Sequence, residues 1–177
     1  PIIKTIIRNM IPRLIEDLIF SSLTSSQKII LLLGARQVGK TTVVWHIGKK
    51  LEKERKKILY LNCDLAEDNA VINTTSKAVL ERLLVLSNID VLLIDEAQRL
   101  DNPGLTLKII HDNFSQIRVL ATGSSSFELK NKLSDPLTGR YLDFTLYPLS
   151  FMEVLGINDP SKNEVLLKNQ SDELLPQ

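Results

Sequence analysis

Residues 28–42 of the chain read KIILLLGARQVGKTT, an apolar run followed by a glycine-rich turn that ends in Lys-Thr-Thr. The turn fits the pattern G-x-x-x-x-G-K-[ST], and it lies between a predicted strand and a predicted helix, as in phosphate-binding loops. Glycines let successive backbone N–H groups point at phosphate oxygens, and the helix N-terminus adds partial positive charge. We therefore predict a nucleotide phosphate site here, with a purely structural glycine turn as the alternative.

The predicted phosphate contacts come from nine consecutive residues, Gly34, Ala35, Arg36, Gln37, Val38, Gly39, Lys40, Thr41 and Thr42. Lys40 is expected to bridge the β- and γ-phosphates, which makes it a catalytic candidate as well as a binding residue. The Thr41 hydroxyl is expected to ligate Mg²⁺.

Further apolar runs alternate with helical segments along the chain. Strands are predicted at 28–33, 58–63, 91–94, 118–121 and 142–146, and helices at 40–54, 73–86, 105–113 and 126–133. The strand runs are apolar throughout, which suits a parallel sheet that is covered on both faces. The alternation predicts an α/β fold, a three-layer sandwich with a five-stranded, mainly parallel sheet. Ligands of such sheets bind beyond the C-terminal ends of the strands.

The third predicted strand ends in two carboxylates, Asp95 and Glu96. Beside a phosphate loop this pair predicts that Asp95 holds Mg²⁺ through a water and that Glu96 polarises the water attacking the γ-phosphate. The alternative is an Asp-Glu pair that caps the next helix. A GTPase would show D-x-x-G here, and a small-molecule kinase would not need the second carboxylate, so the sequence favours ATP hydrolysis.

Three other residues are candidates for the same site. Thr122 or Ser124, at the tip of the fourth predicted strand, would sense the γ-phosphate or position water, unless these residues only cap the following helix. Arg140 precedes the fifth predicted strand, and we expect it near the sheet end that faces the nucleotide. It would act as an arginine finger or an in-chain sensor, and an ordinary surface salt bridge is the alternative.

The composition gives no sign of a strongly charged partner. The chain has 22 Lys and Arg residues and 21 Asp and Glu residues, so its net charge is +1. This charge does not indicate binding to nucleic acid or to an anionic membrane. The basic run at 49–57 ends the helix predicted at 40–54, where cations are favoured by the helix dipole, and nucleic-acid binding is the alternative interpretation of this run. The single cysteine, Cys63, favours a reducing compartment, and we expect a cytoplasmic protein. His46, His111 and Trp45 are expected to be structural.

The N-terminal segment carries apolar pairs at every fourth position, which predicts a helical stripe. Charged residues interrupt it too often for a membrane span, so we expect an amphipathic helical segment packed on the core rather than a membrane-surface helix. Pro12 is expected to kink this helix or to open a second one at its first position. The predicted organisation is therefore residues 1–24 as this segment, 25–155 as the ATPase domain and 156–177 as a linker or tail.

Six short motifs occur in a characteristic order: GARQVGKTT at 34–42, YLNCD at 60–64, IDEAQ at 94–98, TGSS at 122–125, GR at 139–140 and PLSFME at 148–153. The series resembles the AAA_14-type prokaryotic P-loop ATPases of the AAA+ superfamily, which are usually followed by a DUF4143 domain. The resemblance covers about residues 8–155. Ala35 and Ala97 stand where the family most often has Pro and Ile, and neither change removes a ligand.

The resemblance implies a sheet of the ASCE/AAA+ type and a motor or switch that uses ATP and Mg²⁺. It also implies that this chain is only the N-terminal ATPase domain and that a C-terminal domain outside it reaches a DNA or protein client. Self-association of copies through Arg140 is a separate expectation, which follows from the arginine-finger interpretation of that residue. A nucleotide-gated signalling or DNA-associated module that binds ATP with little turnover is the alternative.

Overall fold

A computed structural model describes residues 11–124 and 137–154 of the chain. The chain divides into two compact units. The larger unit, Ile15–Pro148, contains the whole sheet, and the smaller one combines residues up to Leu14 with those from Leu149 onward. The predicted boundaries at 24/25 and 155/156 stay predictions.

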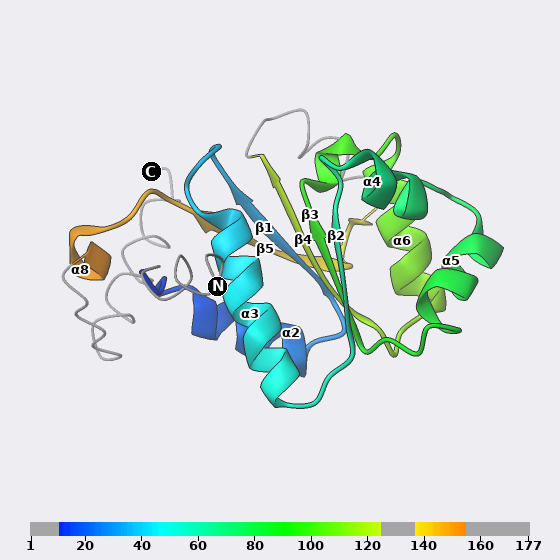
Figure 1. Cartoon of the computed structure of the whole chain (residues 1–177), viewed down its shortest axis with the longest axis horizontal. Helices are drawn as coiled ribbons and strands as arrows, with labels where there is room; N and C mark the ends of the chain where they lie inside the picture. The colour runs from blue at the N-terminus through cyan, green and yellow to red at the C-terminus, as the bar shows by residue number, and fades with distance from the viewer. Residues whose placement is uncertain (1–10, 125–136, 155–177) are drawn as a thin grey trace, which may run out of the picture. The chain divides into compact units, whose positions relative to one another are not determined.

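A five-stranded sheet forms the centre of the larger unit (Figure 1). Its strands are β1 (Ile29–Gly34), β2 (Ile58–Asn62), β3 (Val91–Asp95), β4 (Arg118–Ser124) and β5 (Tyr141–Leu146). Every pairing is parallel, and the order is β2-β3-β4-β1-β5. The predicted α/β fold is confirmed, and the C-terminal ends of β1, β3 and β4 meet at one edge of the sheet.

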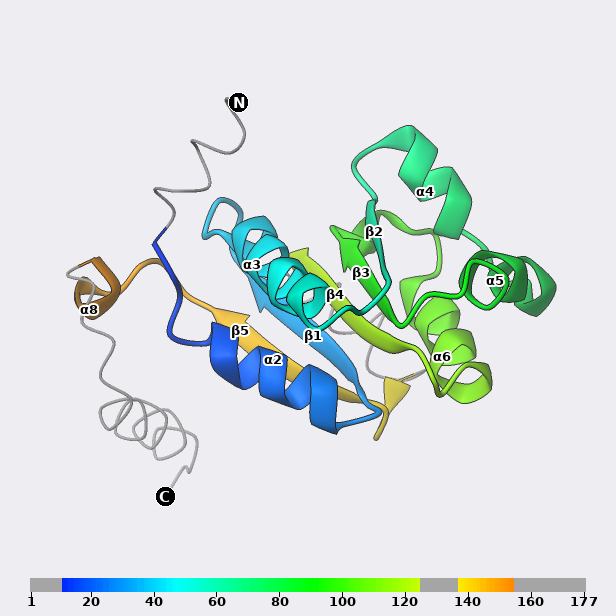
Figure 2. The same ribbon diagram turned by 60° about the horizontal axis from the view of Figure 1, so that its bottom comes forward.

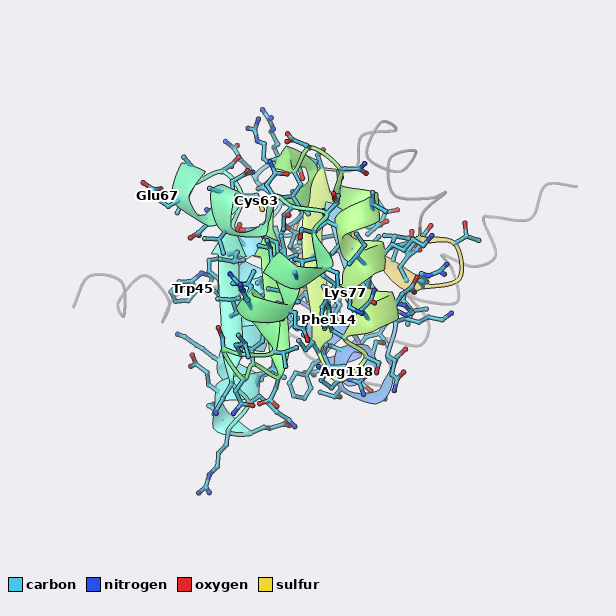
Figure 3. All side chains as sticks on the ribbon, turned by 90° about the vertical axis from the view of Figure 1, so that its right-hand side faces the viewer. Trp45, Cys63, Glu67, Lys77, Phe114 and Arg118 are labelled. Carbon is cyan, nitrogen blue, oxygen red and sulfur yellow. The ribbon has the colours of Figure 1, made fainter. Side chains whose placement is uncertain are left out.

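Helices cover both faces of this sheet, which makes the three predicted layers (Figures 1 and 2). On one face lie α2 (Glu16–Ser25) and α3 (Lys40–Lys53). On the other lie α5 (Lys77–Leu84), α6 (Pro103–Asn113) and the short turn η1 (Ala97–Arg99). Each face has its own apolar cluster; Phe114 and Cys63, labelled in Figure 3, belong to the second.

The helix predicted at 73–86 is present but shorter, as α5, and a further helix that was not predicted, α4 (Ala66–Ile72), precedes it. Only Ile72 of α4 is buried, so this helix lacks the apolar stripe that makes a helix visible in sequence. The helix predicted at 126–133 lies outside the described residues.

Pro12 lies in a non-helical segment, and α2 begins only at Glu16. The expectation that Pro12 opens this helix at its first position is therefore wrong. Glu153 accounts for the difference, since its Oε1 accepts hydrogen bonds from Leu14 N at 3.0 Å and Arg13 Nε at 2.9 Å. These bonds use the backbone N–H that a first helical turn would leave free. No helix within 11–124 and 137–154 has the length and apolar character needed to cross a membrane.

Candidate active site

The glycine-rich turn joins β1 to α3 and adopts a conformation that requires glycine at two positions. Gly39, directly before α3, has φ 98° and is left-handed. A Cβ on Gly34 would lie 2.5 Å from the carbonyl oxygen of Leu146, which is backbone and cannot yield. The close approach of β5 and the curl of the loop thus both depend on glycine, and the loop wraps the N-terminus of α3 as the motif predicts.

Lys40 points back over this loop rather than into solvent. Only 4% of the residue is exposed, and its Nζ donates hydrogen bonds to Gly34 O at 3.0 Å and Ala35 O at 2.9 Å. The same Nζ lies 4.0 Å from Glu96 Oε1. An ammonium group and a carboxylate therefore face each other at the mouth of the loop.

Asp95 is the most enclosed carboxylate of the site, with 1% of the residue exposed. Thr41 Oγ1 donates to its Oδ2 at 2.6 Å, and Tyr60 OH donates to the same oxygen at 3.3 Å. Thr122 Oγ1 donates to its Oδ1. Three hydroxyl groups from α3, β2 and β4 thus hold one carboxylate, and the structure brings together the two residues predicted to serve Mg²⁺.

The oxygen atoms of Thr41 and Asp95 fit a magnesium ion. Mg²⁺ prefers oxygen ligands, and it is bound by one or two protein groups together with phosphate oxygens and water rather than by a full protein cage. The described residues contain no group of three or more His, Cys, Asp and Glu side chains that could hold a metal ion by themselves.

Glu96 follows Asp95 in an unusual backbone conformation, left-handed with φ 55° and ψ 45°. Its backbone N–H donates to Thr122 Oγ1 at 3.0 Å, and its carboxylate accepts a hydrogen bond from Gln98 Nε2. Thr122 therefore contacts both members of the Asp-Glu pair. Ser124 ends β4 and lies opposite Gly34 in the register of β1 and β4, beside the phosphate loop.

Tyr60 and Gln98 belong to two of the sequence motifs, but the sequence alone assigns neither of them a role. Burial, followed by the negative charge of Asp95 and the hydrogen bond to it, raises the pKa of Tyr60 well above its usual value. The phenol therefore stays protonated and remains a donor. A signal for Tyr60 existed, because it is a hydroxyl-bearing residue inside an apolar strand run.

Cys63 adjoins the site through its backbone, since its N–H donates to Asp95 O at 2.9 Å. Burial, then the charges of nearby carboxylates led by Asp68, raises the pKa of the Cys63 thiol to about 12. The thiol stays protonated at ordinary pH and is no nucleophile.

Arg140 lies at the N-terminal ends of the strands, whereas the phosphate loop lies at their C-terminal ends. Its carbonyl accepts a hydrogen bond from Ile29 N, at the start of β1, with a length of 2.9 Å. Its Nε donates to Asp112 Oδ1 at 2.8 Å, and this contact, with His111, lowers the pKa of Asp112. The expectation that Arg140 lies near the nucleotide-facing end is wrong, because a residue preceding a parallel strand lies at the N-terminal edge. An in-chain sensor role does not fit this position.

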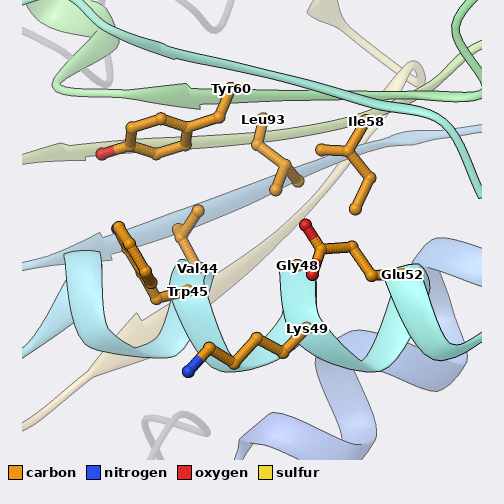
Figure 4. A pocket seen from close by; sticks show the side chains of 8 residues that line it. All are labelled: Val44, Trp45, Gly48, Lys49, Glu52, Ile58, Tyr60 and Leu93. Atoms are coloured by element: carbon orange, nitrogen blue, oxygen red, sulfur yellow. The ribbon is translucent and has the colours of Figure 1, made fainter. Parts of the chain in front are cut away.

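A small hollow lies behind the site, between α3 and the strands β2 and β3 (Figure 4). Its volume is about 190 Å³, and its lining is mainly apolar. The lining residues are Val44, Trp45, Gly48, Lys49, Glu52, Ile58, Tyr60 and Leu93. Tyr60 is shared between this hollow and the Asp95 hydrogen bonds. Trp45 is 42% exposed and lies on the rim, with Lys49 Nζ 5.9 Å from its ring centroid.

Comparison with known proteins gives a family and several relatives. The family model AAA_14, described as an AAA domain, matches residues 26–155. The uncharacterized protein MJ1637 of Methanocaldococcus jannaschii is 30% identical over 157 residues, which cover 82% of this chain and 32% of that protein. The uncharacterized protein Rv2008c of Mycobacterium tuberculosis is 30% identical over 142 residues, 79% of this chain and 29% of that protein. The chain thus spans about a third of the length of these relatives.

Solved structures share the fold at low sequence identity. DnaA from Aquifex aeolicus bound to AMPPCP is 19% identical with a TM-score of 0.56, covering 89% of this chain and 54% of that one. A replication initiator DnaA bound to AMPPCP and single-stranded DNA is 18% identical with the same TM-score, covering 92% and 59%. RIF2 of Saccharomyces cerevisiae is 11% identical with a TM-score of 0.54, covering 90% and 69%.

Proposed function

We propose that this chain, which belongs to the AAA domain family AAA_14 and is a P-loop nucleotide-binding domain, hydrolyses ATP in a Mg²⁺-dependent reaction. One observation carries the proposal. The ammonium of Lys40 and the carboxylate of Glu96 face each other at 4.0 Å, while Thr41 and Asp95 meet at 2.6 Å beside them. A cation for phosphate, an oxygen pair for metal and a carboxylate base for water are the groups that ATP hydrolysis requires.

The roles follow from the surroundings of each group. The phosphate chain would lie on the loop from Gly34 to Thr42, with Lys40 exchanging its two carbonyl partners for β- and γ-phosphate oxygens. Glu96 would take a proton from the attacking water as the water oxygen bonds to the γ-phosphorus. The bond from that phosphorus to the bridging oxygen breaks, and ADP and phosphate leave. Thr122 or Ser124 would sense the γ-phosphate from the end of β4.

Thr41 and Asp95 would hold the magnesium ion, the first directly and the second through a water. When bound, Mg²⁺ neutralises charge on the phosphate oxygens. Asp95 suits this task because its three hydroxyl donors fix its direction.

Arg140 would serve a neighbouring copy, because the phosphate loop of its own chain lies at the opposite end of the strands. The domain would then act as a motor or switch in the cytoplasm, and a DNA or protein client would be reached through parts of longer proteins of this family. A nucleotide-gated, DNA-associated module with little turnover is the second candidate. It is motivated by the DnaA of similar fold that was solved with AMPPCP and single-stranded DNA.

Steady-state release of phosphate from Mg-ATP tests the proposal. Glu96→Gln should lower the rate by about 10²-fold or more, the scale of general-base catalysis, and should keep the affinity for a fluorescent ATP analogue. Glu67→Gln is the matched control, since Glu67 is exposed on α4 (Figure 3), and its rate should equal that of the parent.

The same assay, repeated with added single-stranded DNA, separates the two candidates. A parent that binds the analogue but releases no phosphate with or without DNA would contradict hydrolysis and favour the nucleotide-gated module.

A further inference from the structure

We propose that Gln98 is a positioning residue that holds the Glu96 carboxylate in its working orientation. The inference rests on the proposed function, because it assigns a partner to the base of that reaction. Gln98 Nε2 donates to Glu96 Oε2, and the other carboxylate oxygen, Oε1, is the one that lies 4.0 Å from Lys40 Nζ. One oxygen is thereby tethered and the other faces the phosphate loop.

The turn that carries Gln98 is anchored by burial and by backbone hydrogen bonds. Gln98 is the middle residue of η1, and Ala97, at the start of the turn, and Leu100, directly after it, are each 2% exposed in the apolar cluster of the second face. Two backbone hydrogen bonds close the turn, from Arg99 N to Glu96 O at 3.0 Å and from Leu100 N to Ala97 O at 3.1 Å. The amide group therefore has a fixed origin from which to hold a neighbouring side chain.

Glu96 needs such support. Its side chain is 21% exposed and has several rotatable bonds. Among the described residues, the Glu96 carboxylate accepts one hydrogen bond from a side chain, and the donor is Gln98 Nε2. The backbone of Glu96 is anchored separately through Thr122. Displacement of a catalytic group by about 1 Å can lower a rate by about 10²-fold, so a tether on this carboxylate has a direct kinetic consequence.

The second observation is the other end of the same amide. Gln98 Oε1 is buried and has no hydrogen-bond partner among the described residues. A buried acceptor without a partner destabilises a fold, and an apolar side chain of the same size would avoid that cost. A glutamine kept here for packing alone would be a poor choice, whereas a glutamine kept for its N–H donor explains why the unpaired oxygen is tolerated.

Two substitutions separate positioning from packing. Gln98→Leu preserves volume and removes both the donor and the unpaired oxygen, so we expect kcat for Mg-ATP to fall about 10- to 100-fold while the thermal midpoint stays equal or rises. Gln98→Glu preserves shape but sets an acceptor against the carboxylate, and kcat should fall at least as far. In both variants KM and the affinity for a fluorescent ATP analogue should stay near the parent values. Arg99→Ala, in the same turn with an exposed side chain, is the control and should keep the parent rate.

A double-mutant cycle with Glu96→Gln makes the test specific to the pair. If Gln98 acts through Glu96, adding Gln98→Leu to Glu96→Gln should lower the rate no further. The inference is overturned if Gln98→Leu lowers the rate by the same factor in the Glu96→Gln background as in the parent. A Gln98→Leu protein with the parent kcat also overturns it, even where Glu96→Gln itself is inactive. A parent without hydrolysis, or an active Glu96→Gln, would instead contradict the proposed function and the inference with it.

Discussion

Asp95 and Glu96 are neighbours in sequence, but their side chains have different surroundings. Asp95 is 1% exposed and accepts hydrogen bonds from three hydroxyl groups. Glu96 has one amide donor, and its second oxygen lies near an ammonium group. When two carboxylates have distinct environments, they can take distinct roles. The enclosed one suits a fixed metal ligand and the more open one a proton acceptor.

At the residue scale we predict that Lys40→Ala lowers the affinity for ATP by about 10- to 100-fold, the value of one or two hydrogen bonds to a charged group. The domain should still fold, although Gly34 O and Ala35 O lose their ammonium donor. Titration with a fluorescent ATP analogue measures the affinity, and circular dichroism checks the fold. Lys56→Ala, in the exposed basic run after α3, is the control. Parent-like affinity in a folded Lys40→Ala protein would contradict the phosphate-binding role.

Single residues of the site differ in how far sequence predicts them. Lys40, Thr41 and Asp95 can be predicted because each belongs to a motif of consecutive residues. The Tyr60–Asp95 contact joins different strands, β2 and β3, and it depends on a sheet register that no local pattern contains. Gln98 lies two residues after Glu96, but its contact depends on the left-handed turn at Glu96, which is rare for a residue with a Cβ.

At the element scale the junction of β1, the phosphate loop and β5 depends on Gly34. A Cβ there would meet Leu146 O at 2.5 Å and Val38 Cγ2 at 3.1 Å. We predict that Gly34→Ala lowers the free energy of unfolding by about 1–3 kcal/mol, the cost of overpacking, and weakens ATP binding because the loop must shift. Urea denaturation measures the first effect and analogue titration the second.

Gly48→Ala is the control for that substitution. Gly48 lies inside α3, where a Cβ would make only an ordinary contact of 3.4 Å with Leu93, so alanine should raise stability by about 0.5–1 kcal/mol. If Gly34→Ala were as stable as Gly48→Ala, the close packing of β5 against the loop would not matter for the fold.

The elements show where periodicity predicts structure and where it does not. All five strands were predicted because each is an apolar run between turns, although β4 continues three residues further, to Ser124. The helix α4 was missed because it buries Ile72 alone. The start of α2 was misplaced because the side chain of Glu153 contacts residues 13 and 14, and these contacts span 140 and 139 residues, more than any window of sequence contains.

At the scale of the whole molecule, the parallel sheet separates the candidate groups into two sets. At the C-terminal ends of the strands lie Lys40, Asp95, Glu96 and Thr122. Arg140 lies at the N-terminal ends, beside Ile29. The length of β1 alone, about 3.3 Å per residue over the strand, keeps Arg140 from its own phosphate loop. A head-to-tail arrangement of copies is the geometry in which one edge can meet the other edge of a neighbour.

We therefore predict that Arg140→Ala lowers the rate of ATP hydrolysis by about 10³-fold, the scale of an arginine finger supplied in trans, and leaves ATP affinity near the parent value. The specific activity of the parent should rise with protein concentration in a phosphate-release assay. Mixing Arg140→Ala with Glu96→Gln should restore activity, because one copy then contributes an intact base and the other an intact arginine.

Asp112→Ala is the matched control, since it removes the partner that now holds Arg140 Nε at 2.8 Å and leaves the arginine in place. For an arginine finger, Asp112→Ala should keep the parent rate while Arg140→Ala loses it. For a surface ion pair, the two substitutions remove the same contact, and they should change stability alike and leave the rate intact. Equal behaviour of the two variants, with no dependence on concentration and no rescue on mixing, would assign Arg140 to the ion pair and remove self-association from the mechanism.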